Sequence, residues 1–326
     1  MQYIAVTDTS GNLPSPLAKR YDLKMIPFSY FIEGERFTCL DTESFDGDAF
    51  YSLLKTTPVT TSQINPQEYA DFFEPFLKDG KDVVYVAMSS GISGSCQSAA
   101  LGAELLKERY PDRAIEIVDT RGASLGEGLV AVEAAKMRDE ELSAAEAAKR
   151  LRLLSERMFN VFTVNDLLFL RRGGRLSNLS AIVGTVLGIK PILKGGEDGK
   201  ISAFDTVRSR KRSVKALAAQ YEQYVVEPER QTVGIAHAAC REDAELLIQL
   251  IRSGEHPPKE ILLVDYEPVT GAHVGPGALA LFFESCPGVR AVKGLDTIPE
   301  KVREFFESAQ TRITLPKSPV QKPAHV

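Results

Sequence analysis

The chain alternates short apolar runs with longer amphipathic stretches, and this alternation predicts an α/β protein. Its most informative stretch is residues 81–100, which reads KDVVYVAMSSGISGSCQSAA. The apolar run at residues 83–88 is too short for an ordinary helix and is typical of a strand buried on both faces. Glycines and serines follow the run, and helical spacing begins at Gln97. The pattern therefore predicts a strand, a tight turn and a helix in direct succession.

The turn at residues 89–95, SSGISGS, has the features of an anion-binding site. Glycine lets the backbone turn tightly and come close to a ligand. A strand, a turn and a helix in this order place free backbone N–H groups and serine hydroxyls at a helix N-terminus, which favours an anion. Ser93 or Ser95 could equally serve only to cap the helix, and the motif alone leaves both interpretations open.

The same alternation runs through the first half of the chain. Predicted strands cover residues 3–7, 24–32, 83–88 and 114–118. Predicted helices cover residues 44–55, 67–77, 97–106, 122–138 and 143–157, and the expected caps of three of them are Ser44, Asn65 and Ser143. A polar, hydroxyl-rich loop is expected at residues 56–66. Strands that alternate with helices predict a parallel sheet covered by helices on both faces.

The second half of the chain predicts a mixed sheet. Apolar runs indicate strands at residues 159–164, 192–195, 200–207, 232–237, 261–265 and 278–283. Helices are expected at residues 166–170, 177–187, 209–224, 243–251 and 295–310. The turn GEDG joins residues 192–195 to residues 200–207 as a hairpin, which adds antiparallel strands. Residues 268–277 are expected to form a glycine-rich turn.

The length of the chain predicts more than one domain. Its 326 residues exceed a typical single domain, so two domains are expected. We place an N-terminal α/β/α domain at residues 1–157 and a C-terminal α/β domain at residues 158–290. A helical extension at residues 291–315 and a proline-rich, disordered tail at residues 316–326 are expected to follow.

Composition argues against several classes of partner. A net charge of −5 without a long basic block disfavours nucleic acid. The four cysteines stand far apart and form no CxxC pair, which argues against a zinc site and a disulfide framework. The N-terminus reaches Asp8 too early for a signal peptide, and no apolar stretch is long enough to span a bilayer. We therefore expect a cytoplasmic protein.

Catalytic motifs are sparse. A hydrolase triad of Ser93, His273 and Asp8 is conceivable, but the G-x-S-x-G spacing of a nucleophile elbow is absent. There is no Walker A sequence, and no G-x-G-x-x-G follows the first strand, so no nucleotide site is expected. His273 stands among three glycines in GAHVGPG, where it could donate to an anion or only stabilise a turn. Residues 171–175 and 208–212 are rich in arginine, which indicates either a solvated face or contact with an acidic partner or a phosphate.

Together these motifs resemble the DegV family, the lipid-binding subunits of bacterial fatty-acid kinase. The matching stretches occur in family order along nearly the whole chain: VTDTSGNLP (6–14), TTSQINPQEY (60–69), SSGISGS with QSA after it (89–99), LLFLRRGGRLS (167–177), GIKPIL (188–193) and GAHVGPG (271–277). The resemblance implies a three-layer N-terminal domain with a parallel sheet and a two-layer C-terminal domain with a mixed sheet.

The resemblance also implies a function without catalysis. One long-chain fatty acid would occupy a tunnel between the domains, its carboxylate held by Thr61, Ser93 and His273. Gly94, Ser95, Gly271 and Gly275 would supply backbone N–H groups and shape the two turns. A separate ATP-dependent kinase would then convert the carboxylate to an acyl phosphate, docking on Arg171, Arg172 and Arg208. No cofactor or metal is implied, and transient contact with a membrane surface is allowed.

The tunnel lining is expected to be apolar. The candidates are Ile92, Ile182, Val186, Leu187, Ile189, Leu279 and Phe282, although for any one of them ordinary core packing is the more common role. The chain departs from the family pattern in TDTSGNLP, where TDSTADLP is usual, in Cys96, where tyrosine is common, and in the extension beyond Phe283. A serine hydrolase that uses Ser93 and His273, or a binder of another anionic amphiphile, remain the alternatives.

Overall fold

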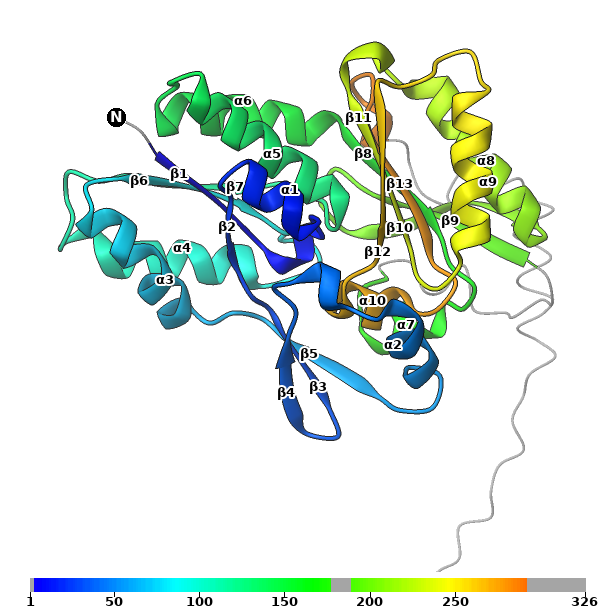
Figure 1. Cartoon of the computed structure of the whole chain (residues 1–326), viewed down its shortest axis with the longest axis horizontal. Coiled ribbons are helices and arrows are strands. Elements are labelled where there is room, and N and C mark those ends of the chain that lie inside the picture. The colour runs from blue at the N-terminus through cyan, green and yellow to red at the C-terminus, as the bar shows by residue number, and fades with distance from the viewer. Residues whose placement is uncertain (1–2, 177–188, 292–326) are drawn as a thin grey trace, which may run out of the picture.

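The computed structural model describes residues 3–176 and 189–291 of the chain. These residues form a four-stranded parallel sheet, a six-stranded mixed sheet and a small three-stranded antiparallel sheet (Figure 1). The α/β architecture with one parallel and one mixed sheet is the predicted fold class, which is confirmed. The described part of the chain has no helix with the length and apolar character needed to cross a membrane.

The parallel sheet has the strand order β2-β1-β6-β7. Its strands are β1 (Tyr3–Asp8), β2 (Lys24–Ile26), β6 (Asp82–Ala87) and β7 (Ile115–Asp119). The residues of β6 are apolar on both sides because helices cover both faces. Val84 and Val86 pack in one hydrophobic cluster with α5 and α6, whereas Val83 and Tyr85 pack in another with α3 and α4. These helices are α3 (Pro66–Lys78), α4 (Ser95–Lys107), α5 (Leu125–Asp139) and α6 (Ala144–Arg157).

The small sheet is built from a segment that was expected to be partly loop. Its strands are β3 (Ser29–Ile32), β4 (Glu35–Thr38) and β5 (Val59–Ser62), in the order β4-β3-β5. The prediction of a loop throughout residues 56–66 is therefore wrong, because β5 pairs antiparallel with β3 and places Thr61 opposite Tyr30. Asn65 caps α3 in a reciprocal capping box with Glu68, as its position predicted.

Two short helices precede β5. They are α1 (Ser15–Arg20) and α2 (Gly47–Leu53). The predicted cap of α2, Ser44, is wrong, because the helix begins later and the Asp46 carboxylate accepts the Ala49 N–H.

The mixed sheet has the strand order β10-β9-β8-β13-β11-β12. Its strands are β8 (Met158–Thr163), β9 (Ile189–Gly195), β10 (Ile201–Arg208), β11 (Thr232–His237), β12 (Glu260–Asp265) and β13 (Leu279–Glu284). The hairpin of β9 and β10 is as predicted, and β11 and β12 are the parallel pair. The helices of this half are α7 (Leu168–Arg172), α8 (Arg210–Tyr224), α9 (Arg241–Arg252) and α10 (Pro268–Val274). The expected glycine-rich turn at residues 268–277 is therefore mostly helix, since α10 occupies its first seven residues.

Helix α5 lies between the parallel and mixed sheets and contacts both, touching β1 and β6 on one side and β8, β11 and β13 on the other (Figure 1). Eleven of its fifteen residues are buried, which is the burial of a central helix rather than of a surface helix. Leu125 lies so close to β11 that a Cβ on Gly234 would collide with it. The α8–α9 pair covers the opposite face of the mixed sheet.

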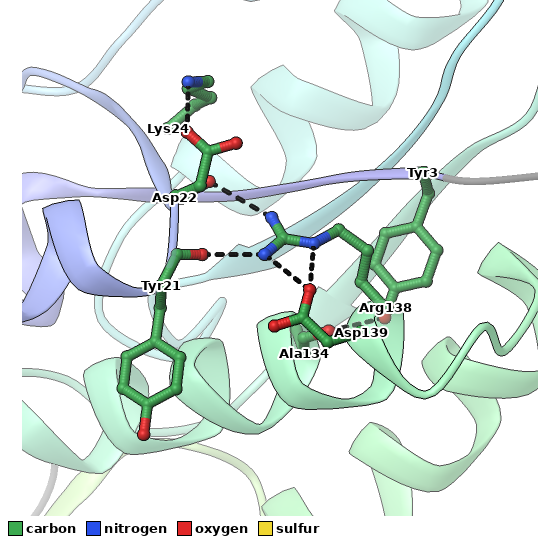
Figure 2. A network of polar contacts seen from close by, with 7 residues as sticks. All are labelled: Tyr3, Tyr21, Asp22, Lys24, Ala134, Arg138 and Asp139. Carbon is green, nitrogen blue, oxygen red and sulfur yellow. Dashed lines mark hydrogen bonds and ion pairs between the residues drawn. The ribbon is translucent and has the colours of Figure 1, made fainter.

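Arg138 fixes the far end of α5. Its guanidinium donates to the backbone carbonyls of Tyr21 and Asp22, at 2.9 and 3.2 Å, and to the carboxylate of Asp139 (Figure 2). One turn earlier, the Ala134 carbonyl accepts the Tyr3 hydroxyl at 2.5 Å (Figure 2). These contacts attach α5 to the loop between α1 and β2 and to the first strand.

A second buried arginine joins the two halves of the chain. Arg290 is 4% exposed, and within residues 3–176 and 189–291 all the acceptors of its guanidinium are backbone carbonyls. The acceptors come from the loop after β7, the α6–β8 junction and the β9–β10 hairpin, namely Thr120, Arg121, Ser155, Met158 and Gly196. Burial lowers the pKa of Arg290 to about 10, so the side chain remains charged at neutral pH.

The parallel sheet falls within residues 3–119 and the mixed sheet within residues 158–284. The domain bounds at 1–157 and 158–290 stay predictions. The helices expected at residues 177–187 and 295–310 and the tail at 316–326 lie outside the described residues, as does all but the first residue of the 291–315 extension.

We predict that Arg290→Met lowers the free energy of unfolding by at least about 2 kcal/mol, because buried carbonyls lose their donor. Methionine retains much of the apolar stem, so the effect isolates the guanidinium. Urea unfolding of the variant and wild type measures the change. Arg252→Met, at the exposed end of α9, is the control and should change stability by no more than about 0.5 kcal/mol. Equal losses in the two variants would contradict the proposed bridging role.

Candidate functional site

A cavity of about 330 Å³ lies where the three sheets meet. Its walls come from the turn after β6, the loop after β7, strand β5, helix α10 and the inner face of the mixed sheet. The carboxyl ends of parallel strands are the usual binding edge of an α/β sheet, and the volume is within the range of small-molecule sites. The apolar part of the lining consists of Phe28, Met88, Ile92, Ala123, Phe162, Leu170, Ile201, Tyr266, Val269, Val274 and Phe282.

The polar end of the cavity is formed by residues far apart in sequence. Thr61 on β5, Ser93 before α4 and His273 in the last turn of α10 all border the cavity. The Thr61 hydroxyl lies 2.8 Å from His273 Nε2, and the direction of this hydrogen bond depends on the imidazole tautomer. The structure therefore brings together the three residues that the family resemblance indicated, while their role in ligand binding stays a proposal.

His273 is held in a tight environment. A Cβ on Gly173 would collide with its Nδ1, so the glycine after α7 gives the imidazole its space. Burial, with a smaller effect from the nearby Arg175 guanidinium, lowers the pKa of His273 to about 4. The imidazole is therefore neutral at physiological pH and offers one N–H and one acceptor nitrogen.

Ser93 is half-buried at the start of the helix that follows the turn. Its hydroxyl accepts the Ser95 N–H at 3.2 Å, while its own N–H donates to the Ser89 carbonyl at 3.1 Å. Gly94 and Ser95 begin α4 but are not among the residues that border the cavity, and the Ser95 side chain is fully buried. The N-cap of α4 is Gly94, and no side chain caps this helix, so the capping interpretation of Ser93 and Ser95 is wrong. Ser93 instead borders the cavity.

The hydrolase triad is not assembled. No hydrogen bond joins Ser93 to His273, or His273 to Asp8, within residues 3–176 and 189–291. The Asp8 carboxylate instead accepts from the Ser10 N–H at 2.9 Å and from the Tyr85 hydroxyl at 2.6 Å, inside the N-terminal core.

Asp8 belongs to a buried acid pair that sequence reasoning missed. Glu127 of α5 is fully buried and accepts hydrogen bonds from Ser10 at 2.8 Å and from Thr7 at 2.9 Å. Burial raises the pKa of both carboxyl groups, and the proximity of Asp8 raises that of Glu127 further. The burial of Glu127 could not be predicted from the sequence pattern, because helical spacing does not show which acidic side chain of a helix is buried.

Helix α10 is stabilised by Glu267, which is 1% exposed. Its carboxylate accepts the N–H groups of Val269 and Thr270, at 2.7 and 2.5 Å. The Glu267 N–H donates to Asn12 at 3.0 Å, so the start of α10 is tied to the turn after β1. Burial raises the pKa of Glu267 to about 7.

Glycine is required at positions 271 and 275 for different structural reasons. A Cβ on Gly271 would collide with the hydroxyl of Tyr51, which donates to the Tyr266 carbonyl at 2.7 Å. Gly275 ends α10 with φ +74° and leaves no room for a Cβ beside Phe169. Gly271 therefore allows helix packing and is not part of a turn as expected, whereas Gly275 is a true turn glycine.

Two arginines that the sequence did not single out, Arg121 and Arg175, border the cavity. The Arg175 guanidinium donates to the carbonyls of Ile92 and Gly173. Sequence reasoning grouped Arg175 with Arg171 and Arg172, which are exposed, as is Arg208 at the end of β10. The spacing of the arginines after α7 was the only available signal, and it could not tell which of them turns inward.

The predicted apolar lining is correct in part. Ile92 and Phe282 border the cavity. Leu279 does not, because alternate residues of β13 face opposite sides and Leu279 packs in the cluster with α8 and α9. Ile189 is also absent from the lining, and Ile182, Val186 and Leu187 lie outside the described residues.

A family model and the relatives of known sequence both match the DegV family. A family model described as the DegV family matches residues 4–285. A DegV domain-containing protein of Clostridium perfringens is 36% identical over 283 residues, covering 86% of this chain and 97% of that protein. One from Streptococcus pyogenes is 33% identical over 283 residues, with 86% and 98% coverage.

Solved structures share the fold. A DegV family protein from Thermus thermophilus, described by its fatty-acid binding, superposes with a TM-score of 0.79 at 26% identity, covering 88% of this chain and 100% of that one. DegV from Bacillus subtilis, described as a fatty acid binding protein, gives 0.75 at 27% identity, with 86% and 98% coverage.

The buried Glu267 carboxyl predicts a pH-dependent stability. Because its pKa rises from 4.5 to about 7 on folding, its stabilising contribution is complete below pH 4.5 and is lost as the pH rises to about 7. Glu267→Gln keeps an oxygen acceptor for the helix but does not titrate. We expect the stability of wild type relative to the variant to fall by about 3 kcal/mol across this range.

Urea unfolding of both proteins between pH 4 and 8 measures the difference. His273 acts in the opposite direction, since its contribution is complete above pH 6.5 and is lost as the pH falls to about 4. It is present in both proteins and cancels in the comparison. Parallel stability profiles would show that Glu267 is not the titrating group.

Proposed function

The chain belongs to the DegV family, and we propose that it binds one long-chain fatty acid with the carboxylate at Thr61, Ser93 and His273. The observation that carries the proposal is that Thr61, Ser93 and His273, from three separate elements, border one cavity, and that Thr61 and His273 are hydrogen-bonded there. The fatty-acid binding described for the relatives from Thermus thermophilus and Bacillus subtilis supports the same ligand class.

The physical chemistry of the site suits a carboxylate with a hydrocarbon tail. A carboxylate taken out of water needs hydrogen-bond donors, and two hydroxyls and a neutral imidazole supply them. Arg175 adds a positive charge at the cavity wall. Each buried methylene contributes about 0.8 kcal/mol, so a tail of about fifteen carbons contributes on the order of 10 kcal/mol before ordering costs. The tail thus provides affinity, and the polar end sets orientation.

We further propose that the protein is a non-catalytic carrier that presents the carboxylate to a separate ATP-dependent kinase. The sequence contains no Walker A motif for a nucleotide. Arg171, Arg172 and Arg208 are exposed, and such side chains suit an acidic face of a partner. The kinase would form the acyl phosphate while the tail stays buried.

Substitutions in the polar cluster test the ligand site. Thr61→Val, Ser93→Ala and His273→Asn should each weaken palmitate binding by about tenfold or more, since hydrogen bonds to a charged group are strong. Isothermal titration of delipidated protein measures the affinities. Ser90→Ala is the matched control, because Ser90 lies in the same turn but bonds Asp119 and does not border the cavity. Unchanged affinity in all three variants would remove the cluster from the site.

The identity of the natural ligand is tested on protein purified gently from cells. Native mass spectrometry should show one fatty acid per chain, and competition should rank fatty acids above other anionic amphiphiles. A protein that carries no lipid and binds none in titration would contradict the carrier function. A covalent fluorophosphonate adduct on Ser93 would instead favour the hydrolase alternative.

A further inference from the structure

Asn160 is a buried amide on the inner face of the mixed sheet, and the proposed function gives it no role. It stands within β8, whose six residues are all buried, and it is 6% exposed. Asn160 borders the cavity, as do Phe162 on the same face of β8 and Phe282, which pairs with Asn160 from β13. The pattern of this strand predicts an apolar side chain at position 160, so the presence of an amide needs a separate explanation.

The hydrogen-bonding capacity of this amide is mostly unused. Its Nδ2 donates to the Met158 carbonyl at 3.5 Å, the outer limit of a hydrogen bond, and its Oδ1 has no partner within residues 3–176 and 189–291. The Met158 carbonyl favours this orientation, because a flipped amide would bring two oxygens together. A buried acceptor without a donor destabilises a folded protein, and native proteins seldom contain one. A molecule bound in the cavity would supply the missing donor.

The loop between β7 and α5 packs against the amide and adds a donor of its own. A Cβ on Gly122 or Gly126 would collide with the Asn160 amide, so glycine lets the loop approach it closely. Ser124, between these glycines in the sequence, is 1% exposed and borders the cavity. Its hydroxyl accepts from Asn12 Nδ2 at 3.2 Å, and in the described part of the chain its own proton has no acceptor. The cavity wall therefore carries an unused acceptor and an unused donor.

We propose that the cavity binds a fatty acid that carries a hydroxyl group on its chain, and that Asn160 and Ser124 bind this hydroxyl. The inference rests on the proposed function, which places the carboxylate at Thr61, Ser93 and His273, and it narrows the ligand class. A hydroxyl fits because it donates to the Asn160 oxygen and accepts from the Ser124 hydroxyl. A ketone would offer only an acceptor, and an unmodified alkyl chain would offer neither.

The selectivity follows from the cost of unpaired polar groups. An unmodified hydrocarbon tail that fills the cavity keeps water from the Asn160 amide and supplies no donor in its place. A site whose buried polar groups match a hydroxyl discriminates strongly against the analogue that lacks it. Arg121 also borders the cavity, and its guanidinium would instead suit a second carboxylate on the chain, so the experiment includes a dicarboxylic acid.

Isothermal titration of delipidated protein tests the proposal. The hydroxyl lies in the middle of the chain in 12-hydroxystearate and at its end in 16-hydroxypalmitate, and each is compared with its parent, stearate or palmitate. At least one hydroxy acid should bind about tenfold more tightly than its parent. Asn160→Leu, which has a similar size and no polar side-chain atom, should reduce this preference to less than about threefold and leave the parent acid bound at least as tightly as by wild type.

Two further variants separate the hydroxyl site from general damage to the fold. Ser124→Ala removes the donor and should also lower the preference for the hydroxy acid. Asn165→Leu is the matched control, because Asn165 follows the same strand but is exposed and does not border the cavity. It should leave the preference unchanged. Since the preference is the ratio of two affinities of one protein, partial unfolding of a variant lowers both affinities and does not alter the ratio.

Each outcome of the titration has a defined meaning. Wild type that binds both parent acids at least as tightly as their hydroxy derivatives would overturn the hydroxyl site and leave the fatty-acid function standing. A preference that persists in Asn160→Leu would also overturn it, because another group would then bind the hydroxyl. Tighter binding of hexadecanedioate than of either hydroxy acid, lost in Arg121→Gln, would assign the polar wall to a second carboxylate. Failure to bind any of these acids would reject the proposed function itself.

Discussion

The hydrogen bond between Thr61 and His273 depends on how the whole molecule is assembled. It joins residues 212 positions apart, one on an edge strand of the small sheet and one at the end of α10. The bond forms only when β5 pairs with β3 and when α10 is held by its Glu267 cap and by the contact of Asn12 with the backbone of Glu267. The polar end of the cavity is therefore a product of tertiary packing, since neither segment alone places two polar groups together.

Much of the fold follows from local pattern, and the exceptions have physical causes. The apolar run of β6 predicted a strand covered on both faces, and the GEDG turn predicted the β9–β10 hairpin. Strand β5 was missed because a short strand on the edge of an exposed sheet carries polar residues on both faces. Helix α10 was missed because its glycine and its proline resemble turn chemistry, whereas Pro268 stands at the first position of the helix and Gly271 admits Tyr51.

Some residues of the candidate site could also be predicted from the sequence, whereas others could not. The sequence alone indicated Ser93 and His273 as anion-binding candidates but could not place them near each other, and Thr61 was identified only through the family resemblance. Arg175 could not be distinguished from its neighbours, because the direction of an arginine side chain after a short helix depends on what packs against it. Arg290 lies beyond residues 4–285, which the family model matches, and its carbonyl partners come from three separate segments, so no local pattern signals its role.

The position of α5 has a consequence for how a molecule reaches the cavity. Because this helix packs on both large sheets, moving the sheets apart would expose apolar surface along most of its length. Such a hinge motion would require much of the free energy that stabilises the folded protein. Exchange of a bound molecule is then governed by local opening of the lining, so its rate is set by the mobility of a few wall segments while the body of the protein stays closed.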